Sequence, residues 1–226
     1  MIVPIERFHD LCQGIDTEPR KVTVVFHVGR CGSTLLMQCF HNIPDCKTLS
    51  ENTPMFDYIR EAKRGSLYHR VTSREYEDLM VSALKFQVQQ FPVGSKVFIK
   101  TTANLEYYSI PVIAKHFPSF RVINCVRGGH HVAKSFYRAF SNDPLLMMVI
   151  AVARSVVVRF FANGLDEEEP IKEFIDGRNY GIFELFFLQW ATNMITYQRN
   201  VGKTEVLDVF YEDLISKPEE TLRKVS

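Results

Sequence analysis

The residue types and spacing with the clearest chemical meaning lie in residues 21–40, KVTVVFHVGRCGSTLLMQCF. An apolar strand is expected to run into a Gly-containing turn that leads directly into a helix. Backbone N–H groups of such a turn and the positive end of the helix dipole can bind a phosphate. A Walker A loop also requires Lys between its last Gly and the next Ser or Thr. Here Ser33 follows Gly32 directly and the cation is Arg30, so the loop favours a nucleotide-like donor other than ATP.

A second cluster with phosphate-binding residue types is residues 121–140, RVINCVRGGHHVAKSFYRAF. The apolar run ends at Val126, Arg127 begins a Gly-containing loop, and Ser135 follows eight residues later in a predicted helix. The planar guanidinium of Arg suits bidentate binding of phosphate, and Ser135 is placed to reach the same anion. Taken alone, the two residues also fit a surface ion pair and a solvent-facing helix position.

A third cluster, residues 209–225 (VFYEDLISKPEETLRKV), joins a predicted strand to a predicted helix. Tyr211 comes at the end of the strand, and Pro218 stands where the first turn of a helix tolerates proline. By itself this segment indicates no more than a strand-to-helix connection.

The three clusters are joined by apolar, β-forming runs that alternate with helical patterns. The predicted strands are residues 22–28, 48–49, 96–100, 121–126 and 205–210. The predicted helices are residues 34–41, 55–63, 73–91, 107–116, 130–140, 144–161 and 180–199. Because strands that are apolar on both faces are covered by helices on both sides, we expect a doubly wound α/β fold. This is a three-layer sandwich with a central parallel sheet and a P-loop-NTPase-like core.

In such sheets, ligands bind beyond the carboxyl ends of the strands. The turn with Arg30, together with Lys100, Arg127 and Tyr211, follows the ends of four predicted strands. We therefore expect these side chains, which are far apart in the sequence, to lie along one edge of the sheet.

The composition limits the class of protein. With 226 residues and a hydrophobic fraction of 46%, we expect a single domain over residues 1–226, and the helical pattern at 221–226 indicates a missing C-terminal segment. The net charge of +1 argues against a general nucleic-acid-binding protein but allows a small anionic ligand. The apolar run 145–153 is too short to span a membrane. The N-terminus lacks a signal-peptide pattern, which favours the cytoplasm unless an anchor for the Golgi lies outside this sequence.

The five cysteines, which include no CxxC pair, indicate neither a disulfide framework nor a zinc site, and we expect no metal. Cys31 lies in the turn beside a helix N-terminus, a position that can lower the pKa of a thiol. We interpret Cys31 as a small space-filling residue rather than a nucleophile.

In this order, the three clusters resemble the sulfotransferase family that uses 3′-phosphoadenosine 5′-phosphosulfate (PAPS). The resemblance covers residues 22–225 and is closer to the carbohydrate- and protein-directed branch. GRCGSTLL is similar to the loop for the 5′-phosphosulfate, RVINCVRGGHHVAKSFYR to the 3′-phosphate segment, and YEDLISKPEETL to the Tyr-Glu-Asp-Leu element. The chain departs from the family at Gly128 and Gly129, where Asp-Pro is frequent, and this departure predicts a looser loop entry.

The resemblance implies which residues bind the donor. Arg30 stands where the family has a basic residue against the bridging and sulfuryl oxygens, and Lys100 matches the lysine that assists the transferring group. Arg127 and Ser135 would hold the 3′-phosphate, and Tyr211 would lie near the adenine. The residues implied around the 5′-phosphate are Cys31, Gly32, Ser33 and Thr34.

The general base is the least determined residue. Thr102 stands where many cytosolic members have His, which argues against the phenol- and steroid-directed type. Glu51 follows the short second strand, where other branches of the family often have Glu, so we prefer Glu51 as the base. A structural pairing of Glu51 with Arg30 is the alternative. His27 is a lesser candidate because its position within a strand is more typical of a core residue.

The reaction predicted from this resemblance is transfer of a sulfuryl group from PAPS to an acceptor hydroxyl, with a carbohydrate or another extended molecule as the acceptor. Catalysis would consist mainly of positioning and charge stabilisation. Two alternatives stay open. One is a non-catalytic nucleotide-binding relative, and the other is a P-loop kinase of small molecules, which the missing Walker lysine disfavours.

Overall fold

The computed structural model describes residues 5–50, 72–101, 106–145, 147–148, 181–202 and 204–225. Its centre is a sheet of five parallel strands in the order β2-β3-β1-β4-β5. The strands are β1 (Lys21–His27), β2 (Cys46–Ser50), β3 (Lys96–Lys100), β4 (Arg121–Val126) and β5 (Val206–Phe210). The predicted α/β fold with a central parallel sheet is thus confirmed, although the second strand is longer than the predicted residues 48–49.

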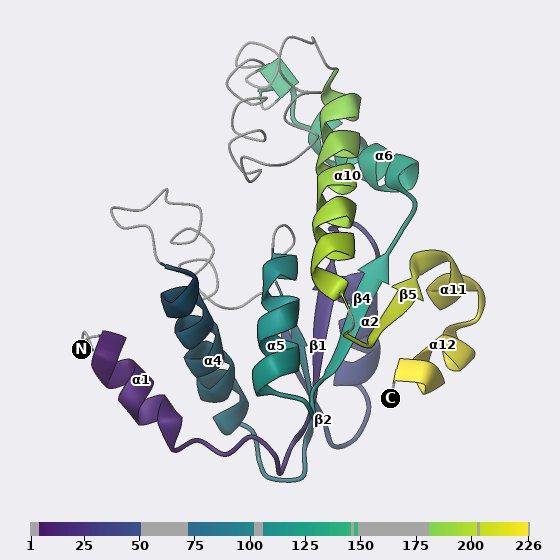
Figure 1. Ribbon diagram of the computed structural model, residues 1–226. Helices are drawn as coiled ribbons and strands as arrows, with labels where there is room; N and C mark the ends of the chain where they lie inside the picture. The colour runs from purple at the N-terminus through teal and green to yellow at the C-terminus, as the bar shows by residue number, and fades with distance from the viewer. Residues whose placement is uncertain are drawn as a thin grey trace.

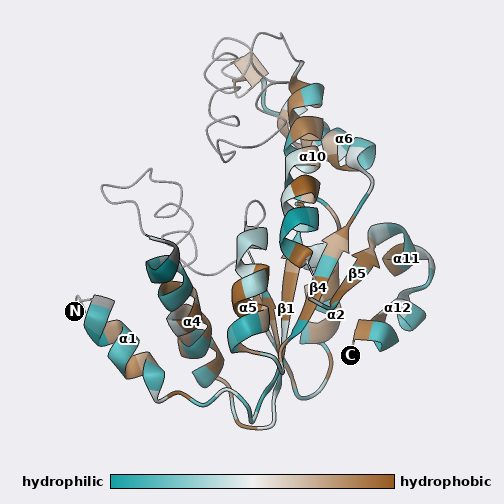
Figure 2. Ribbon diagram, viewed as in Figure 1, coloured by the Kyte–Doolittle hydropathy of each residue, from teal (hydrophilic) through white to brown (hydrophobic). Residues whose placement is uncertain are grey.

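The three central strands form the core because both of their faces are apolar. Every residue after the first in β1, β3 and β4 is buried, whereas the edge strands β2 and β5 are only partly buried. Figure 2 shows the same contrast, with hydrophobic residues along the central strands and hydrophilic residues on the outer helices. Valine and isoleucine, which favour strands, supply most of this buried surface.

Helices cover both faces of the sheet (Figure 1). On one side lie α4 (Ser73–Gln89), α5 (Ile110–His116) and α10 (Ile182–Val201), with α1 (Ile5–Gln13) packed on α4. On the other side lie α2 (Ser33–His41), α11 (Tyr211–Ser216) and α12 (Pro218–Val225). The turn η1 (Glu106–Ser109) precedes α5, and α6 (Gly129–Ser141) follows β4 and packs on α10. Among the described residues, no helix is both long enough and apolar enough to cross a lipid bilayer.

Two of the predicted helices cannot be compared with the structure. Residues 55–63, and most of residues 144–161, lie outside the described part of the chain. The helix predicted over 107–116 is divided into the 3₁₀ turn η1 and the helix α5. The other predicted helices agree with the structure to within about two residues at each end.

The chain reverses its direction across the sheet at β1. From β1 it passes over β3 to the edge strand β2, and from β3 it passes β1 to reach β4 on the other side. In open α/β sheets this reversal marks the place where ligands bind, beyond the carboxyl ends of the strands. The β1–α2 turn, the end of β3 and the β4–α6 connection all meet there.

A hydrogen-bond network, of which the Tyr107–Asn124 bond is buried, connects α10 to the strands that carry this edge. The Tyr107 hydroxyl donates to Asn124 Oδ1 (2.9 Å), and Asn124 Nδ2 donates to Asp208 Oδ1 (3.0 Å). The Tyr197 hydroxyl of α10 donates to the same Asp208 oxygen (2.9 Å). Burial and the Asp208 carboxylate raise the pKa of Tyr197, so its hydroxyl remains a donor. Because Asn124 belongs to β4 and Asp208 to β5, the network fixes the position of α10 over both strands.

Candidate active site

The turn between β1 and α2 is built from residues in the left-handed backbone region. The angle φ is 75° at Gly29, 52° at Arg30 and 84° at Gly32. Gly32 is also required by the available space, because a Cβ there would lie 2.5 Å from Cδ2 of Tyr211. No side chain caps the N-terminus of α2. The first N–H groups of α2 are therefore suited to bind an anion.

His27 and Cys31 support this turn from the core. The Gly29 N–H donates to His27 Nδ1 (3.2 Å), which places the ring proton on Nε2, 2.9 Å from the carbonyl oxygen of Thr101. Cys31 is only 1% exposed, and a hydrogen bond with the Cys125 thiol lowers its pKa and raises that of Cys125. The burial of Cys31 agrees with its interpretation as a space-filling residue.

Lys100 brings a cation to the same turn from the neighbouring strand β3. Its side chain is only 5% exposed, and Nζ donates to Thr34 Oγ1 in the first turn of α2 (3.1 Å). The end of β3 and the start of α2 are therefore in direct contact. An anion bound at the N-terminus of α2 would lie beside this ammonium group, as expected for an anion-binding turn.

Arg127 joins three segments on the other side of β1. Its Nη1 donates to the carbonyl oxygen of Arg30 (3.1 Å), and its guanidinium carbon lies 4.1 Å from the centre of the Tyr211 ring. The Arg30 guanidinium in turn donates from Nε to Ser135 Oγ on α6 (3.0 Å). The structure thus brings Arg30, Arg127 and Tyr211 together, as expected from the strand ends, and places Ser135 of α6 beside Arg30.

These arginines line a pocket of about 450 Å³ with residues of α6, which we call the α6 pocket. Its lining consists of Arg30, Arg127, His131, Lys134, Ser135, Arg138, Ala139 and Asn142. None of these residues carries a carboxylate, and within the described part of the chain no ion pair joins the pocket's Arg and Lys side chains to one. The pocket therefore has an excess of positive charge that suits a phosphate group.

One buried polar atom in this region lacks a partner among the described residues. Arg127 Nε is inaccessible to solvent and makes no hydrogen bond there. A buried donor without a partner is costly, and it is expected where a ligand completes the site. Together with the tight turn at Gly32, this donor set fits a nucleotide with two separate anionic groups.

For the remaining candidate residues, the predicted role stays a prediction. Glu51 and Thr102 lie outside the described residues. Tyr211 packs between Gly32 and the Arg127 guanidinium, while its predicted position near an adenine stays a prediction. The Arg30 guanidinium lies in the α6 pocket, and its predicted contact with the sulfuryl end of a donor also stays a prediction.

Sequence reasoning missed two contributors to this site. Lys134 lines the α6 pocket. The sequence could have indicated this, since positions 131, 134 and 138 are spaced to share one face of a helix. Trp190 of α10 donates from Nε1 to the carbonyl oxygen of Arg127 (3.0 Å). Nothing in the sequence indicated this contact, because it depends on how α10 crosses α6.

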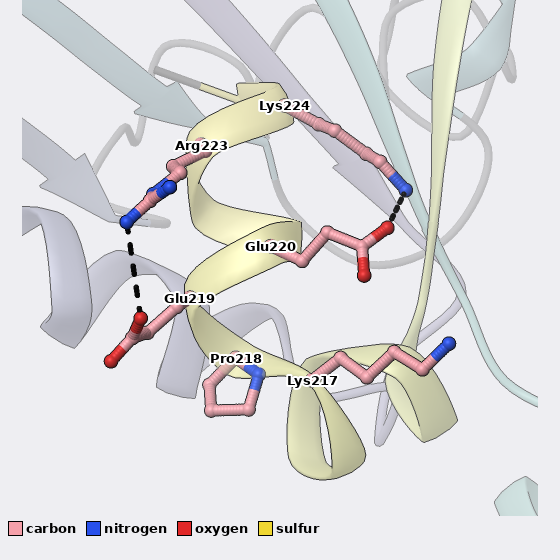
Figure 3. Close-up of a pocket in the computed structure, with 6 residues that line it drawn as sticks. All are labelled: Lys217, Pro218, Glu219, Glu220, Arg223 and Lys224. Carbon is pink, nitrogen blue, oxygen red and sulfur yellow. Dashed lines mark hydrogen bonds and ion pairs between the residues drawn. The ribbon is translucent and has the colours of Figure 1, made fainter.

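A second pocket, which we call the α12 pocket, is formed by α12 and the residue before it (Figure 3). It has a volume of about 610 Å³ and is lined by Lys217, Pro218, Glu219, Glu220, Arg223 and Lys224. Its charges pair within the helix: Lys224 Nζ lies 2.8 Å from Glu220 Oε1, and Arg223 Nη2 lies 4.0 Å from Glu219 Oε2. The described residues contain no group of His, Cys, Asp and Glu side chains placed to hold a metal ion.

Comparisons with known proteins agree with this geometry. A sequence profile described as the sulfotransferase family matches residues 24–226. No curated protein sequence matches the chain. Solved structures with a similar fold include a sulfotransferase from Alicyclobacillus acidocaldarius, with 12% identity, a TM-score of 0.50, and coverage of 91% of this chain and 79% of the other.

Two further solved structures share the fold. The sulfotransferase STF9 from Mycobacterium avium has 12% identity and a TM-score of 0.51, covering 96% of this chain and 67% of the other. The sulfotransferase domain from the curacin biosynthetic pathway has 15% identity and a TM-score of 0.52, covering 92% of this chain and 72% of the other. At these identities the structural similarity speaks to the fold alone.

Proposed function

The chain belongs to the sulfotransferase family, and from this membership we propose that it transfers a sulfuryl group from PAPS to an acceptor hydroxyl. The products are a sulfate ester and adenosine 3′,5′-bisphosphate. The observation that carries the proposal is the α6 pocket, where Arg30, Arg127 and Ser135 meet beside the β1–α2 turn. A 3′-phosphate is the group that distinguishes PAPS from other adenine nucleotides, and this pocket has the charge to bind it.

The order of the strands supports a donor that lies across the end of β1. Lys100 ends β3 on one side of β1, and Arg127 follows β4 on the other side. Two strand spacings separate their backbones by about 10 Å. The 5′-phosphosulfate would lie at the N-terminus of α2 beside Lys100, and the 3′-phosphate would lie in the α6 pocket.

The residues at the proposed sulfuryl end can stabilise the transition state. Sulfuryl transfer, like phosphoryl transfer, is an in-line displacement in which negative charge builds up on the leaving phosphate oxygen. Lys100 and the first N–H groups of α2 are fixed before the reaction and would stabilise this charge. Lys100 is held by Thr34, so little reorganisation is needed as the charge develops.

Glu51 remains our proposed general base. In the sequence it directly follows Ser50, the last residue of β2, and Ser50 pairs with Lys100 of β3. Its carboxylate would accept the proton of the acceptor hydroxyl as the oxygen forms its bond to sulfur. The proposed acceptor is a carbohydrate or another extended hydroxyl compound, since Thr102 replaces the histidine of the phenol-directed branch.

The proposal is tested by incubating the protein with radiolabelled PAPS and a panel of hydroxyl acceptors. We expect label in an acceptor with equal release of adenosine 3′,5′-bisphosphate. Lys100→Met should lower kcat by about 100- to 1,000-fold, because it removes one fixed donor to the developing charge. Tight binding of adenosine 3′,5′-bisphosphate without turnover on any acceptor would instead identify a non-catalytic relative.

A further inference from the structure

Trp190 contacts the β4–α6 connection in two ways. Its indole Nε1–H donates to the carbonyl oxygen of Arg127 at 3.0 Å. Its ring also packs closely against the start of α6: a Cβ on Gly129 would be 2.5 Å from Cε3 of Trp190. The glycine that departs from the family pattern thus provides the space that the indole occupies.

The Arg127 carbonyl depends on this contact. Arg127 follows the last residue of β4 and precedes Gly128, the residue that caps α6, so its own carbonyl belongs to neither the sheet nor the helix. The Gly128 carbonyl accepts from the N–H groups of His131 and Val132. Among the described residues, the Arg127 carbonyl accepts a hydrogen bond from Trp190 alone. Without this donor, the half-buried Arg127 carbonyl would have no hydrogen-bond partner among the described residues.

The helix that carries Trp190 is itself fixed to the same strands. Tyr197 lies two turns further along α10 and bonds to Asp208 of β5, which in turn bonds to Asn124 of β4. Arg127 is the first residue after β4. The helix that carries the indole is therefore linked by hydrogen bonds, through Asp208, to the strand that Arg127 follows.

We propose that Trp190 is a positioning residue for recognition of the 3′-phosphate, acting through the backbone of Arg127. Its N–H fixes the peptide of Arg127, and with it the direction from which the guanidinium enters the α6 pocket. The other contacts of that side chain, with the Arg30 carbonyl and the Tyr211 ring, then hold the guanidinium in place. This inference rests on the proposed donor, since it assigns the specificity of that same site.

The alternative is that Trp190 only fills space between α6 and α10. Trp190→Phe separates the two roles, because phenylalanine keeps most of the ring packing and removes the N–H donor. The readout is the ratio of affinities for adenosine 3′,5′-bisphosphate and AMP, which lacks the 3′-phosphate. We expect Trp190→Phe to lower this ratio roughly 2- to 10-fold, the range for loss of one hydrogen bond, with AMP affinity unchanged.

Phe187→Leu provides the matched control. Phe187 also touches the position of a Gly129 Cβ, at 2.9 Å, and its ring centre lies 5.5 Å from that of Trp190. The described structure gives it no hydrogen bond to Arg127. This variant should disturb the same packing yet leave the affinity ratio at the wild-type value. A ratio that falls equally in both variants would overturn the positioning role.

A further variant keeps the inference testable if Trp190→Phe unfolds. Gly129→Ala forces the indole away from the start of α6 and should lower the same ratio. Where Trp190→Phe folds, combining it with Arg127→Ala should add no further loss to that of Arg127→Ala, since no guanidinium is left to position. A wild-type protein with no preference for the bisphosphate contradicts the proposed donor, whereas preference that survives in Trp190→Phe and Gly129→Ala contradicts only the role of Trp190.

Discussion

The α6 pocket and the α12 pocket are both lined by Arg and Lys side chains, but only the α12 pocket also contains carboxylates. The α12 pocket is the larger, at about 610 Å³ against about 450 Å³. Its Lys224 and Arg223 face Glu220 and Glu219 one helical turn away. The α6 pocket has two Arg from loops and two further cations from a helix, and its lining includes no carboxylate.

Uncompensated positive charge therefore distinguishes the candidate site from the α12 pocket better than volume does. Paired charges on a solvated helix satisfy one another and leave little attraction for a ligand. Cations gathered from several segments without acidic partners repel one another, and an anionic ligand relieves that repulsion. The α6 pocket also adjoins the turn before α2, where uncapped N–H groups add a second anion-binding element.

The largest effect on ligand binding is expected for Arg127→Ala. We predict a loss of about 10- to 150-fold in affinity for adenosine 3′,5′-bisphosphate, the range for charged hydrogen bonds, with AMP much less affected. Calorimetric titration of both nucleotides measures the two affinities. Equal losses for the two nucleotides would show that Arg127 supports the fold of the site rather than the 3′-phosphate.

A smaller effect should distinguish two exposed arginines that lie in different pockets. Arg138→Ala in the α6 pocket should weaken binding of the bisphosphate by about 1.5- to 5-fold, as expected for an exposed cation near an anion. Arg223→Ala in the α12 pocket should change nothing. Repeating both titrations at high salt should reduce the Arg138 effect, because added ions screen exposed charges. Equal effects of the two substitutions would show that the bisphosphate is not bound preferentially in the α6 pocket.

The smallest effect concerns the ion pair of the α12 pocket. The Lys224 ammonium lowers the pKa of Glu220, and Glu220 raises that of Lys224. A lowered carboxyl pKa stabilises the fold above the ordinary glutamate pKa, and this stabilisation is lost as the pH falls through the lowered value. Glu220→Gln should therefore be slightly less stable than wild type near neutral pH and equal to it in acid. Thermal unfolding at several pH values measures this, and a difference that persists in acid would contradict it.

The sequence predicted the strands of the sheet well because their signals are local. The bounds of β3 and β4 match the predictions, since each is a short apolar run that polar or turn-forming residues delimit. The meeting of the Arg30 turn with Arg127 and Tyr211 was also predictable. It follows from one rule, that parallel strands end at the same edge of the sheet.

Other features were not accessible from the sequence because they depend on packing angles and side-chain torsions. The direction of the Arg30 side chain toward Ser135 is one such feature. The contact of Trp190 with Arg127 is another, since it needs α10 to cross α6 at one particular height. The requirement for glycine at position 129 follows only from that crossing. From Gly128 and Gly129 we predicted a looser loop entry, whereas Trp190 packs closely against Gly129 in the structure.

The assignment of the α6 pocket to a 3′-phosphate is tested most directly by calorimetric titration of the purified protein with adenosine 3′,5′-bisphosphate, AMP and ATP. We predict clear preference for the 3′-phosphorylated nucleotide, and loss of that preference in Arg127→Ala. Binding of all three nucleotides with equal affinity, or preference for ATP, would contradict the assignment of the α6 pocket to a 3′-phosphate.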